Sequence, residues 1–504
     1  MNHITEKNIL IVGSGLGGLM CGALLSKEGF RVTVLEKHDR PGGCLQTFRH
    51  EGAVYETGFH TLGGFHPDAL LPKMLQWLGI WDDLLPHIVP LDPDGFDHVL
   101  LGQRTFRLPI GKDRFTDALS RAFPHEADHI RAYMDEVWRI CSQIPLYNLE
   151  MPDPNGLFGS GMEERSAAAM ISQYIRDPEL QALLAWSNTL YAGEKDCTPD
   201  FVAALVTKMY VEGAVRFRDG TDVLSKALQR VITTSGGQVL PGKEVIGMDV
   251  KGRKVEAVRT ADGDRFTADT VISSLHPALT TRLLPDGSLS PAYRRRLQSL
   301  RNSCSIFTLF IRFRPDTFPY LNHNLYVYGH AADVWDTVLK SPEEAPANML
   351  VITPPRSGGD RWATCMLVHV LMQPEVVEAW QDSRPGRRPD AYTAFKERLS
   401  ETILNRLEDI FPKIKGTIQH HFAATPLTLQ HYLSLYEGAV YGTVHDCRSL
   451  YTSFLSTRTK VSNLFLTGQS VRLHGICGVP VTALETCAQL VGMETLLNHI
   501  KGTA

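Results

Sequence analysis

Residues 8–48 read NILIVGSGLGGLMCGALLSKEGFRVTVLEKHDRPGGCLQTF, and this stretch decides the fold. An apolar, β-rich run (8–12) precedes a Gly-x-Gly-x-x-Gly turn (13–18). A helix of small residues, a second apolar run (31–35) and the acidic Glu36 follow. This order is typical of a βαβ unit that binds a dinucleotide. Because strand, turn, helix and acid agree, the pattern favours a binding site over a glycine turn that merely closes a loop.

The glycines and the acid each have a physical role. Gly13 allows a tight turn, Gly15 lets backbone N–H groups approach a pyrophosphate, and Gly18 lets the helix pack closely on the strand. The helix after Gly15 directs its positive end at the phosphates. Glu36 follows Gly13 by about 20 residues, the spacing at which a carboxylate accepts hydrogen bonds from ribose hydroxyls. An acid here, rather than an arginine, favours FAD or NAD over a cofactor with a 2′-phosphate.

The composition is that of an ordinary globular enzyme. The 504 residues are too many for one compact core, so we expect two or three domains. A net charge of −4 without a long basic run gives no support for nucleic-acid binding. The nine cysteines contain no Cys-x-x-Cys pair. That spacing excludes a zinc ribbon and a disulfide-reductase dithiol, and we predict no metal site.

The sequence also bears on location. It contains no run of about 18 apolar residues, and no apolar signal segment precedes the first expected strand. We therefore expect a cytoplasmic protein with reduced thiols. Peripheral contact with a membrane stays open.

A glycine-flanked segment after the opening unit contains one titratable ring. Residues 52–64 read GAVYETGFHTLGG, and the glycines indicate backbone that passes close to a ligand. His60 is either a hydrogen-bonded loop residue or a group near a redox centre, and the sequence leaves both readings open.

The middle of the chain predicts a second domain. Residues 67–210 have a helical pattern, with apolar residues at three- and four-residue spacing and helix starts near 178 and 200. The apolar faces are either core or the lining of a substrate tunnel. Beyond 277 the period becomes two, with a strand over 306–313 and a long helix over 392–407. Helices with a largely antiparallel sheet predict an α+β domain.

Two later segments complete the first domain. Residues 238–274 predict a ββ ribbon that returns to a strand, with a turn at Asp262-Gly263. Residues 463–480 predict a strand that ends at Gly468, a loop, and a helix that starts near Val479. A helix N-terminus there would stabilise negative charge on a reduced flavin. The predicted division is 1–66, 211–280 and 461–504 for nucleotide binding, and 67–210 and 281–460 for substrate.

With both ends in view, essentially the whole chain resembles the flavin-dependent family of phytoene desaturases, carotenoid isomerases and retinol saturases. Residues 13–18 and 36–43 resemble the ADP-binding half of the FAD site. TGFHTLG at 57–63 is similar to the Thr-Gly-x-His segment of retinol saturases. LTGQ at 466–469, with 475–480, is similar to the C-terminal flavin motif in its retinol-saturase form.

Weaker likenesses and departures complete the comparison. Segments 425–428 and 438–442 resemble motifs of the substrate domain, and 217–224 resembles a Gly-Gly turn in which Asp219 replaces the first glycine. Cys44 stands where related flavoproteins often have arginine. A cysteine at this position favours a relation to the retinol saturases over one to the amine oxidases. It also means that the chain lacks the arginine cation that would lie near the pyrophosphate.

The resemblance implies both fold and activity. The fold is α/β, a Rossmann-like FAD/NAD(P)-binding domain of the glutathione-reductase type, with a discontinuous α+β substrate domain as in amine oxidases and phytoene desaturases. The activity is that of a FAD-dependent oxidoreductase that saturates, desaturates or isomerises C=C bonds of an apolar conjugated substrate, such as a carotenoid- or retinoid-like polyene. A flavin amine oxidase of the same fold is the alternative; it needs an aromatic cage and a flavin-facing lysine, which spacing does not locate. A redox-inert FAD-binding protein is a third reading.

We expect a lipophilic small-molecule substrate and a separate electron donor or acceptor. The sequence contains no second Gly-x-Gly-x-x-Gly motif that would indicate a separate nicotinamide-binding domain. We therefore expect the electron donor or acceptor to be a soluble nicotinamide, a quinone or oxygen. His60 is the candidate catalytic acid or base. The residues expected to bind FAD are Gly13, Ser14, Gly15, Leu16, Gly17, Gly18, Glu36, Lys37, Gly42, Gly43, Cys44, Gly58, Val245, Ser273, Gly468, Gln469, Gly478 and Val479.

Overall fold

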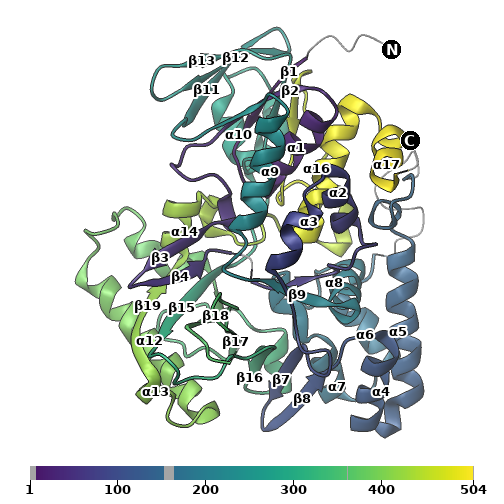
Figure 1. Ribbon diagram of the computed structural model, residues 1–504, viewed down its shortest axis with the longest axis vertical. Helices are drawn as coiled ribbons and strands as arrows, with labels where there is room; N and C mark the ends of the chain where they lie inside the picture. Colours follow the sequence, from purple (N-terminus) through teal and green to yellow (C-terminus); the bar gives the residue numbers. More distant parts are fainter. Residues whose placement is uncertain (1–6, 59, 153–163, 360, 503–504) are drawn as a thin grey trace.

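The structure is a computed structural model and describes residues 7–58, 60–152, 164–359 and 361–502. Phe59, which belongs to the retinol-saturase-like segment 57–63, lies outside the described residues. Two large sheets organise the chain, one in the upper and one in the lower half of the view in Figure 1.

The first sheet is parallel and has five strands, as expected for a dinucleotide-binding domain. Its order is β10-β2-β1-β14-β20, so the N-terminal βαβ unit joins strands from distant parts of the chain. Four of the five residues of β1 are buried, which explains its unbroken apolar run. The strands are β1 (Asn8–Val12), β2 (Arg31–Leu35), β10 (Gln238–Leu240), β14 (Thr270–Ser273) and β20 (Leu464–Leu466).

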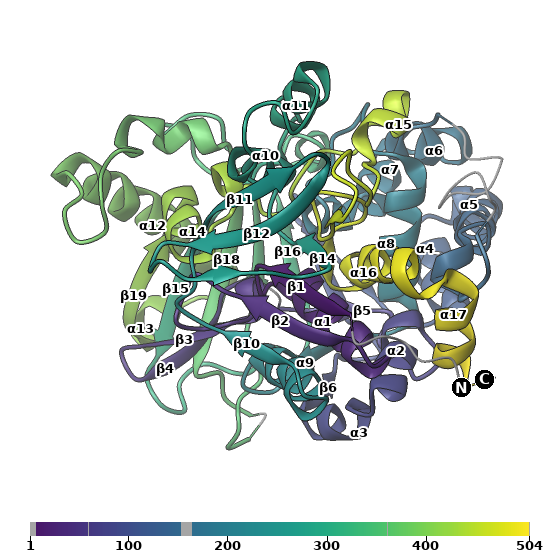
Figure 2. The ribbon, with the colours of Figure 1, turned by 90° about the horizontal axis from the view of Figure 1, so that it is seen from above.

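Helices cover one face of this sheet and a smaller sheet covers the other (Figure 2). On the helical face, α1 (Leu16–Lys27) packs against both α9 (Asp222–Thr234) and α16 (Gly475–Val491). On the other face, the antiparallel sheet β11-β12-β13 shares a core with β1. The predicted two-stranded ribbon therefore has a third, short strand after the turn. Its strands are β11 (Val245–Lys251), β12 (Lys254–Thr260) and β13 (Arg265–Phe266).

Glycines in α1 permit this close packing. A Cβ atom at Gly18 would lie 2.0 Å from the carbonyl oxygen of Gly13, and one at Gly22 would lie 2.7 Å from Cδ1 of Ile232 on α9. Real Cβ atoms essentially never come so close to another heavy atom. The helix is consequently buried over almost its whole length.

The second large sheet is mixed and has seven strands in the order β19-β15-β18-β17-β16-β7-β8. The β16–β7 pair is parallel and the other pairs are antiparallel. One face packs on α12 (Asp390–Ile410). The strands are β7 (Asp97–Leu101), β8 (Arg104–Leu108), β15 (Ser305–Phe313), β16 (Asn324–Tyr328), β17 (Asn348–Ile352), β18 (Cys365–Met372) and β19 (Ile418–Ala424).

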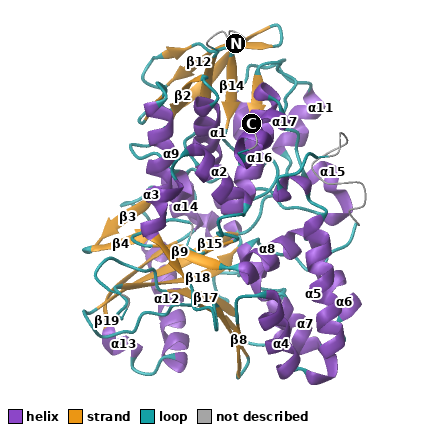
Figure 3. Cartoon of the chain, turned by 45° about the vertical axis from the view of Figure 1, so that its right-hand side comes forward, coloured by secondary structure: helices purple, strands orange, loops and turns teal. Residues whose placement is uncertain are grey.

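Helices α4 to α8 stack beside this sheet, whereas α2 packs on α1, α16 and α17 and α3 packs on α9 (Figure 3). The predicted start of α7 is confirmed, because the Asp177 carboxylate accepts from the N–H groups of Glu179 (2.9 Å) and Leu180 (3.1 Å). The helices of this region are α2 (Leu70–Leu78), α3 (Trp81–Leu84), α4 (Lys112–Ala122), α5 (Ala127–Ser142), α6 (Ala167–Tyr174), α7 (Pro178–Leu184) and α8 (Asp200–Glu212). The remaining helices are α10 (Pro277–Leu283), α11 (Pro291–Gln298), α13 (Ile414–Thr417), α14 (Pro426–Leu433), α15 (Leu450–Ser453) and α17 (Met493–Lys501).

The expectation that 67–210 is helical throughout is wrong for 88–108. This segment forms β6 (Ile88–Pro90), β7 and β8, and β7 and β8 extend the second large sheet. Residues in β7 alternate between buried and half-buried, which is the period-two signal of a strand. The strand pairs on one side with β8, the next strand in the chain, and on the other with β16, more than 200 residues away in the sequence.

Two small sheets link the halves of the molecule. The hairpin of β3 (Thr47–His50) and β4 (Ala53–Glu56) leaves the nucleotide-binding end and places Phe48 and Tyr55 against Phe310 of β15. In the other small sheet, β9 (Ala214–Phe217) pairs with β5 (Leu62–Gly63) on one side and with β6 on the other. The division into a nucleotide-binding and a substrate domain stays a prediction. None of the described helices combines the length and the apolar composition needed to cross a membrane.

Candidate active site

Two cavities meet at the junction between the large sheets. The nucleotide cavity has a volume of about 360 Å³ and lies at the Gly-x-Gly-x-x-Gly turn. The substrate cavity, of about 190 Å³, lies between α8 and the seven-stranded sheet. Both are lined by Cys44, Leu433, Leu435 and Gln469, which therefore mark the place where the cavities adjoin.

Most of the predicted cofactor contacts line the nucleotide cavity. They are Gly13, Ser14, Gly15, Leu16, Gly17, Glu36, Lys37, Gly43, Cys44, Val245, Gly468, Gln469 and Val479. Gly58 and Gly478 line the substrate cavity instead. Gly18, Gly42 and Ser273 line neither cavity. Gly18 serves helix packing, and the Ser273 hydroxyl is engaged by Thr280 Oγ1 at 2.7 Å, so its neighbour Ser274 faces the cavity.

The turn has the geometry that a pyrophosphate requires. Gly15 is the N-cap of α1, and a Cβ atom built there meets nothing within 4 Å, because the position faces open cavity. A Cβ atom at Gly17 would lie 2.9 Å from Cα of Gly468, so the turn also packs directly on the C-terminal motif. The backbone N–H groups at the start of α1 therefore stay free to meet an anion.

Glu36 is held at the end of β2 by the turn itself. Its Oε2 accepts from the Ser14 N–H (3.1 Å) and the Ser14 hydroxyl (2.5 Å), and its Oε1 accepts from the His38 N–H (3.0 Å). A carboxylate oxygen can accept two hydrogen bonds, so Oε1 retains capacity for a ribose hydroxyl. The residues present therefore fit the ADP half of FAD.

A basic residue that the sequence did not single out lines the same cavity. Arg282 comes from α10, and its guanidinium donates to the Tyr436 hydroxyl at 3.1 Å. It adds a positive charge to a cavity that Lys37 and Lys243 also line. Burial raises the pKa of the Cys44 thiol to about 11, so this side chain is neutral.

The C-terminal motif begins its helix earlier than predicted. Helix α16 starts at Gly475, after His474 as N-cap, and not near Val479. Pro480 lies inside the helix. The first turn of α16 brings Gly475, Ile476 and Gly478 to the wall of the substrate cavity.

The wall of the substrate cavity is mostly apolar, although tyrosine, histidine, threonine and amide side chains also line it. Helix α8 contributes Val202, Leu205, Val206 and Met209, so its apolar stripe lines a cavity as well as a core. The sheet contributes Ile306, Leu350, Ile352 and Leu371. Among the described residues that line this cavity there is no aspartate, glutamate, lysine or arginine.

His60 lies in the wall of this cavity and is paired with a buried carboxylate. Its Nδ1 lies 2.9 Å from Oε2 of Glu56, which is 1% exposed. With the carboxylate as acceptor, Nδ1 carries the proton and the lone pair of Nε2 stays free. The second oxygen of Glu56, Oε1, has no hydrogen-bond partner among the described residues. The sequence pointed to His60 but not to Glu56, although the two residues are four positions apart.

A second histidine, His369 of β18, stacks on His60 with ring centroids 4.5 Å apart. Its Nδ1 lies 3.0 Å from the Thr308 hydroxyl, while its Nε2 has no partner among the described residues. Burial, and then the neighbouring His60, hold the pKa of His369 well below its usual range. His369 is therefore neutral, and its only signal in the sequence was a lone histidine within a buried apolar strand.

Buried polar groups fix the loop that carries His60. The Thr61 hydroxyl donates to Oδ1 of Asn324 at 2.9 Å, and the fully buried Arg216 donates to the same oxygen at 2.9 Å. Asn324 in turn donates to Oδ1 of Asp97 at 2.7 Å. Burial raises the pKa of Asp97 to about 7. This network joins the loop to β7 and β16 and thereby positions His60.

The two cavities and the parallel sheet define a dinucleotide-dependent oxidoreductase with a buried apolar substrate site. The chain belongs to the family of flavin containing amine oxidoreductases, whose model matches residues 16–491. FAD is accordingly the cofactor of this enzyme.

Known proteins resemble the chain over nearly its full length. All-trans-retinol 13,14-reductase of Danio rerio is 28% identical, with 96% of this chain and 86% of the relative covered. The Homo sapiens protein of that name is 26% identical over 99% of this chain and 88% of the relative. Prolycopene isomerase of Arabidopsis thaliana is 24% identical, with 85% of this chain and 73% of the relative covered.

Solved structures share the fold. An oxidoreductase from Methanosarcina mazei superposes with a TM-score of 0.65 at 18% identity, over 95% of this chain and 99% of that protein. A triple mutant of putrescine oxidase superposes with a TM-score of 0.64 at 17% identity, over 98% of this chain and 99% of that protein. These likenesses confirm the predicted fold class.

Proposed function

We propose that this enzyme acts on an apolar conjugated polyene, such as a retinoid or a carotenoid. The reaction is the saturation of a C=C bond, the formation of one by desaturation, or the isomerisation of one. The observation that carries the proposal is the substrate cavity, which adjoins the nucleotide cavity and has no charged residue among its described lining residues. The names of the relatives, all-trans-retinol 13,14-reductase and prolycopene isomerase, support the same substrate class.

The protein residues divide the chemistry between them. Bound FAD supplies hydride transfer at the junction of the cavities. His60 holds or accepts the second hydrogen as a proton at Nε2, because Nδ1 is occupied by Glu56. The Glu56 carboxylate keeps the ring in one orientation and stabilises its protonated form. The apolar side chains of α8 exclude water, so that proton transfer takes place with substrate and not with solvent.

A flavin amine oxidase is the second candidate, and the family match and the putrescine oxidase fold favour it. An amine oxidase of this fold is expected to have both an aromatic cage for the amine and a flavin-facing lysine, and a carboxylate would bind a charged alkylammonium group. Tyrosines line the cavity, but no carboxylate or lysine does so among the described lining residues. The uncharged lining therefore favours the polyene over the amine.

Anaerobic flavin chemistry distinguishes the two candidates. The purified holoenzyme would be reduced with dithionite and mixed with single retinoids, carotenoids or amines, and its flavin absorbance followed. Reoxidation by a polyene with a saturated product supports a reductase, and reduction of the oxidised enzyme by a carotenoid supports a desaturase. Reduction by an amine, with no response to any polyene, would overturn the proposal. A soluble nicotinamide, a quinone and oxygen would be compared as electron partners in the same assay.

Replacing His60 tests its role in proton transfer. For His60→Ala we expect a fall in kcat of roughly 10²–10⁴-fold with unchanged FAD content, because general acid–base catalysis contributes that much. Glu56→Gln should lower kcat in the same direction, since it removes the charge that orients the ring. His66→Ala is the matched control, because His66 lines neither cavity. Unchanged turnover in His60→Ala would return His60 to a structural role.

A further inference from the structure

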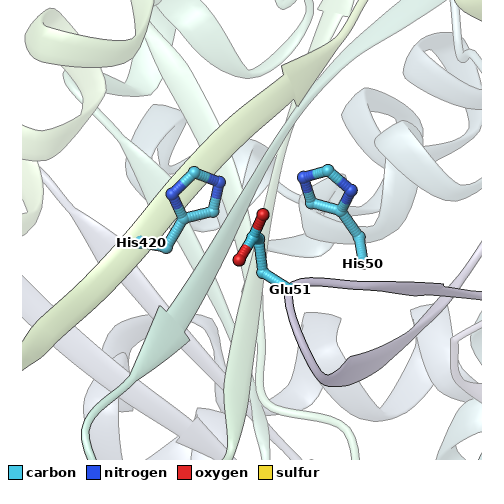
Figure 4. A group of neighbouring side chains, drawn as sticks. All are labelled: His50, Glu51 and His420. Carbon is cyan, nitrogen blue, oxygen red and sulfur yellow. The ribbon is translucent and has the colours of Figure 1, made fainter.

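Three metal-binding side chains meet at the tip of the β3–β4 hairpin, outside both cavities. His50 ends β3, Glu51 begins the turn, and His420 lies in β19 (Figure 4). One ligand atom from each of the three lies within 4.8 Å of the others. His50 and His420 are 370 positions apart in the sequence, so residue spacing could not indicate this cluster. The sequence prediction of no metal site rested on local cysteine spacing.

The two imidazoles rest on a rigid aromatic floor. The His50 ring packs on the Phe422 ring with centroids 4.2 Å apart, and the His420 ring lies 5.7 Å from that of His50. Phe422 is itself stacked on Phe310 at 4.8 Å and meets Tyr55 at 5.2 Å. Because this floor belongs to paired strands, the imidazoles lose little conformational freedom when they bind a ligand.

The turn that carries Glu51 is also fixed. Glu51 has φ of +46° and Gly52 has φ of +77°, as in the tight turns that close two-residue hairpins. A Cβ atom at Gly52 would lie 2.8 Å from a guanidinium nitrogen of Arg312, so the turn packs against β15. The carboxylate of Glu51 is thereby kept beside the two imidazoles. Arg312 brings one positive charge near the cluster, and the carboxylate offsets it.

The three side chains have no other partners. Among the described residues, none forms a side-chain hydrogen bond or ion pair with His50, Glu51 or His420. By contrast, the imidazole of His129 is paired with the carboxylate of Glu126 at 2.6 Å. Two imidazole nitrogens and a carboxylate oxygen within 4.8 Å of one another, on exposed and half-buried side chains without another such partner, offer the donor set of a transition-metal site.

We propose that His50, Glu51 and His420 bind one divalent first-row transition-metal ion, with water in the remaining positions. Two imidazole nitrogens and one carboxylate oxygen suit zinc, cobalt or nickel better than calcium or magnesium, which prefer oxygen donors alone. The ion ties the hairpin to β19. Since the same hairpin ends at Glu56, the ion strengthens the attachment of the strand that carries the partner of His60. The site is independent of the proposed reaction.

The test uses chelator-treated holoenzyme without an affinity tag, and Zn²⁺ or Co²⁺ alone as the probe. We expect titration calorimetry to show one Zn²⁺ per chain, Co²⁺ to give visible d–d bands, and Zn²⁺ to raise the melting temperature. His50→Ala and His420→Ala should each weaken binding by at least the roughly 10–100-fold that loss of an outer-shell partner costs. Glu51→Gln should weaken it in the same direction without altering the shape of the turn.

The neighbouring histidine gives a matched control. His421 follows His420 in β19, so its side chain points to the opposite face of the strand, and His421→Ala should bind Zn²⁺ like the wild type. FAD content reports that each variant is folded. Absence of Zn²⁺ uptake by the wild type would overturn the site, as would uptake that survives in His50→Ala, His420→Ala and Glu51→Gln, because the ion would then be bound elsewhere.

Discussion

Two glycines of the opening turn should respond in opposite ways to added side chains. At Gly15 a Cβ atom meets nothing within 4 Å, so Gly15→Val projects into the nucleotide cavity without a clash in the protein. At Gly18 a Cβ atom would lie 2.0 Å from the carbonyl oxygen of Gly13, and Gly18→Ala therefore forces α1 away from the turn. One variant tests the cofactor site and the other tests the fold.

The magnitudes follow from these contacts. Gly15 is an N-cap, where valine is disfavoured, so Gly15→Val should destabilise the cofactor-free protein by only about 1 kcal/mol. In the complex its side chain crowds the pyrophosphate, and overpacking of about 1–3 kcal/mol corresponds to roughly 5- to 150-fold weaker FAD binding. For Gly18→Ala, overpacking near the upper limit of about 3 kcal/mol is offset by about 1 kcal/mol of helix propensity. A net loss of about 2 kcal/mol in folding stability remains.

The assay separates binding from folding. FAD affinity would be measured by quenching of flavin fluorescence, and the melting temperature would be measured on cofactor-free protein. Gly416→Ala is the control, because a Cβ atom there meets nothing within 4 Å and the residue lines neither cavity. Wild-type FAD affinity in Gly15→Val would refute the assignment of this cavity to the pyrophosphate. Wild-type stability of cofactor-free Gly18→Ala would refute the close contact between α1 and the turn.

Two further predictions concern charge. Burial raises the pKa of Asp97 to about 7, whereas the unfolded carboxyl ionises near pH 3.9, so the unfolded chain binds fewer protons between these values. Stability should fall as pH rises from about 4 to 7, and Asp97→Asn should flatten that part of the melting-temperature profile; equal slopes in both proteins contradict this. Arg282→Ala should weaken FAD binding roughly tenfold in the fluorescence assay, because it removes a cation from the nucleotide cavity. Arg295 lines neither cavity, so the control variant Arg295→Ala should bind FAD with wild-type affinity. Equal FAD affinities of Arg282→Ala and Arg295→Ala would exclude a role for Arg282 in binding the cofactor.

Features set by neighbouring residues could be predicted from the sequence, and features set by long-range pairing could not. The strand, turn and helix of 8–35 are determined locally, and the predicted strands 8–12 and 31–35 coincide with β1 and β2. The N-cap at Asp177 is also local, and the structure contains it. Strand β7 was missed because its sequence, DHVLL, does not alternate between polar and apolar residues; of its two partners, β8 follows it directly and β16 lies far away in the sequence.

The residues of the candidate site also differ in whether local sequence or long-range pairing places them. The nucleotide half is a continuous motif, so most of its predicted residues line one cavity. Glu56 could have been found, because a carboxylate four residues before His60 is within reach in many local conformations. His369 could not, because pairing of β15 with β18 determines which residue of β18 meets His60. The cation at Arg282 was missed for the same reason, since α10 reaches the cavity only in the folded chain.

The electrostatics of the substrate cavity explain how one fold confines both substrate and proton. Burial raises the pKa of Cys477 to about 12 and that of Cys44 to about 11, and it raises the pKa values of the lining tyrosines further. Burial also holds the pKa of His474 and His369 well below the usual range. All of these groups are therefore neutral near pH 7. Among the described titratable residues that line this cavity, His60 alone has a carboxylate partner, which is why we propose its Nε2 as the atom that exchanges a proton with substrate. Under the proposed function, a wall without Asp, Glu, Lys or Arg favours an apolar substrate through desolvation, and the Glu56–His60 pair would give or take the proton at one place on that substrate.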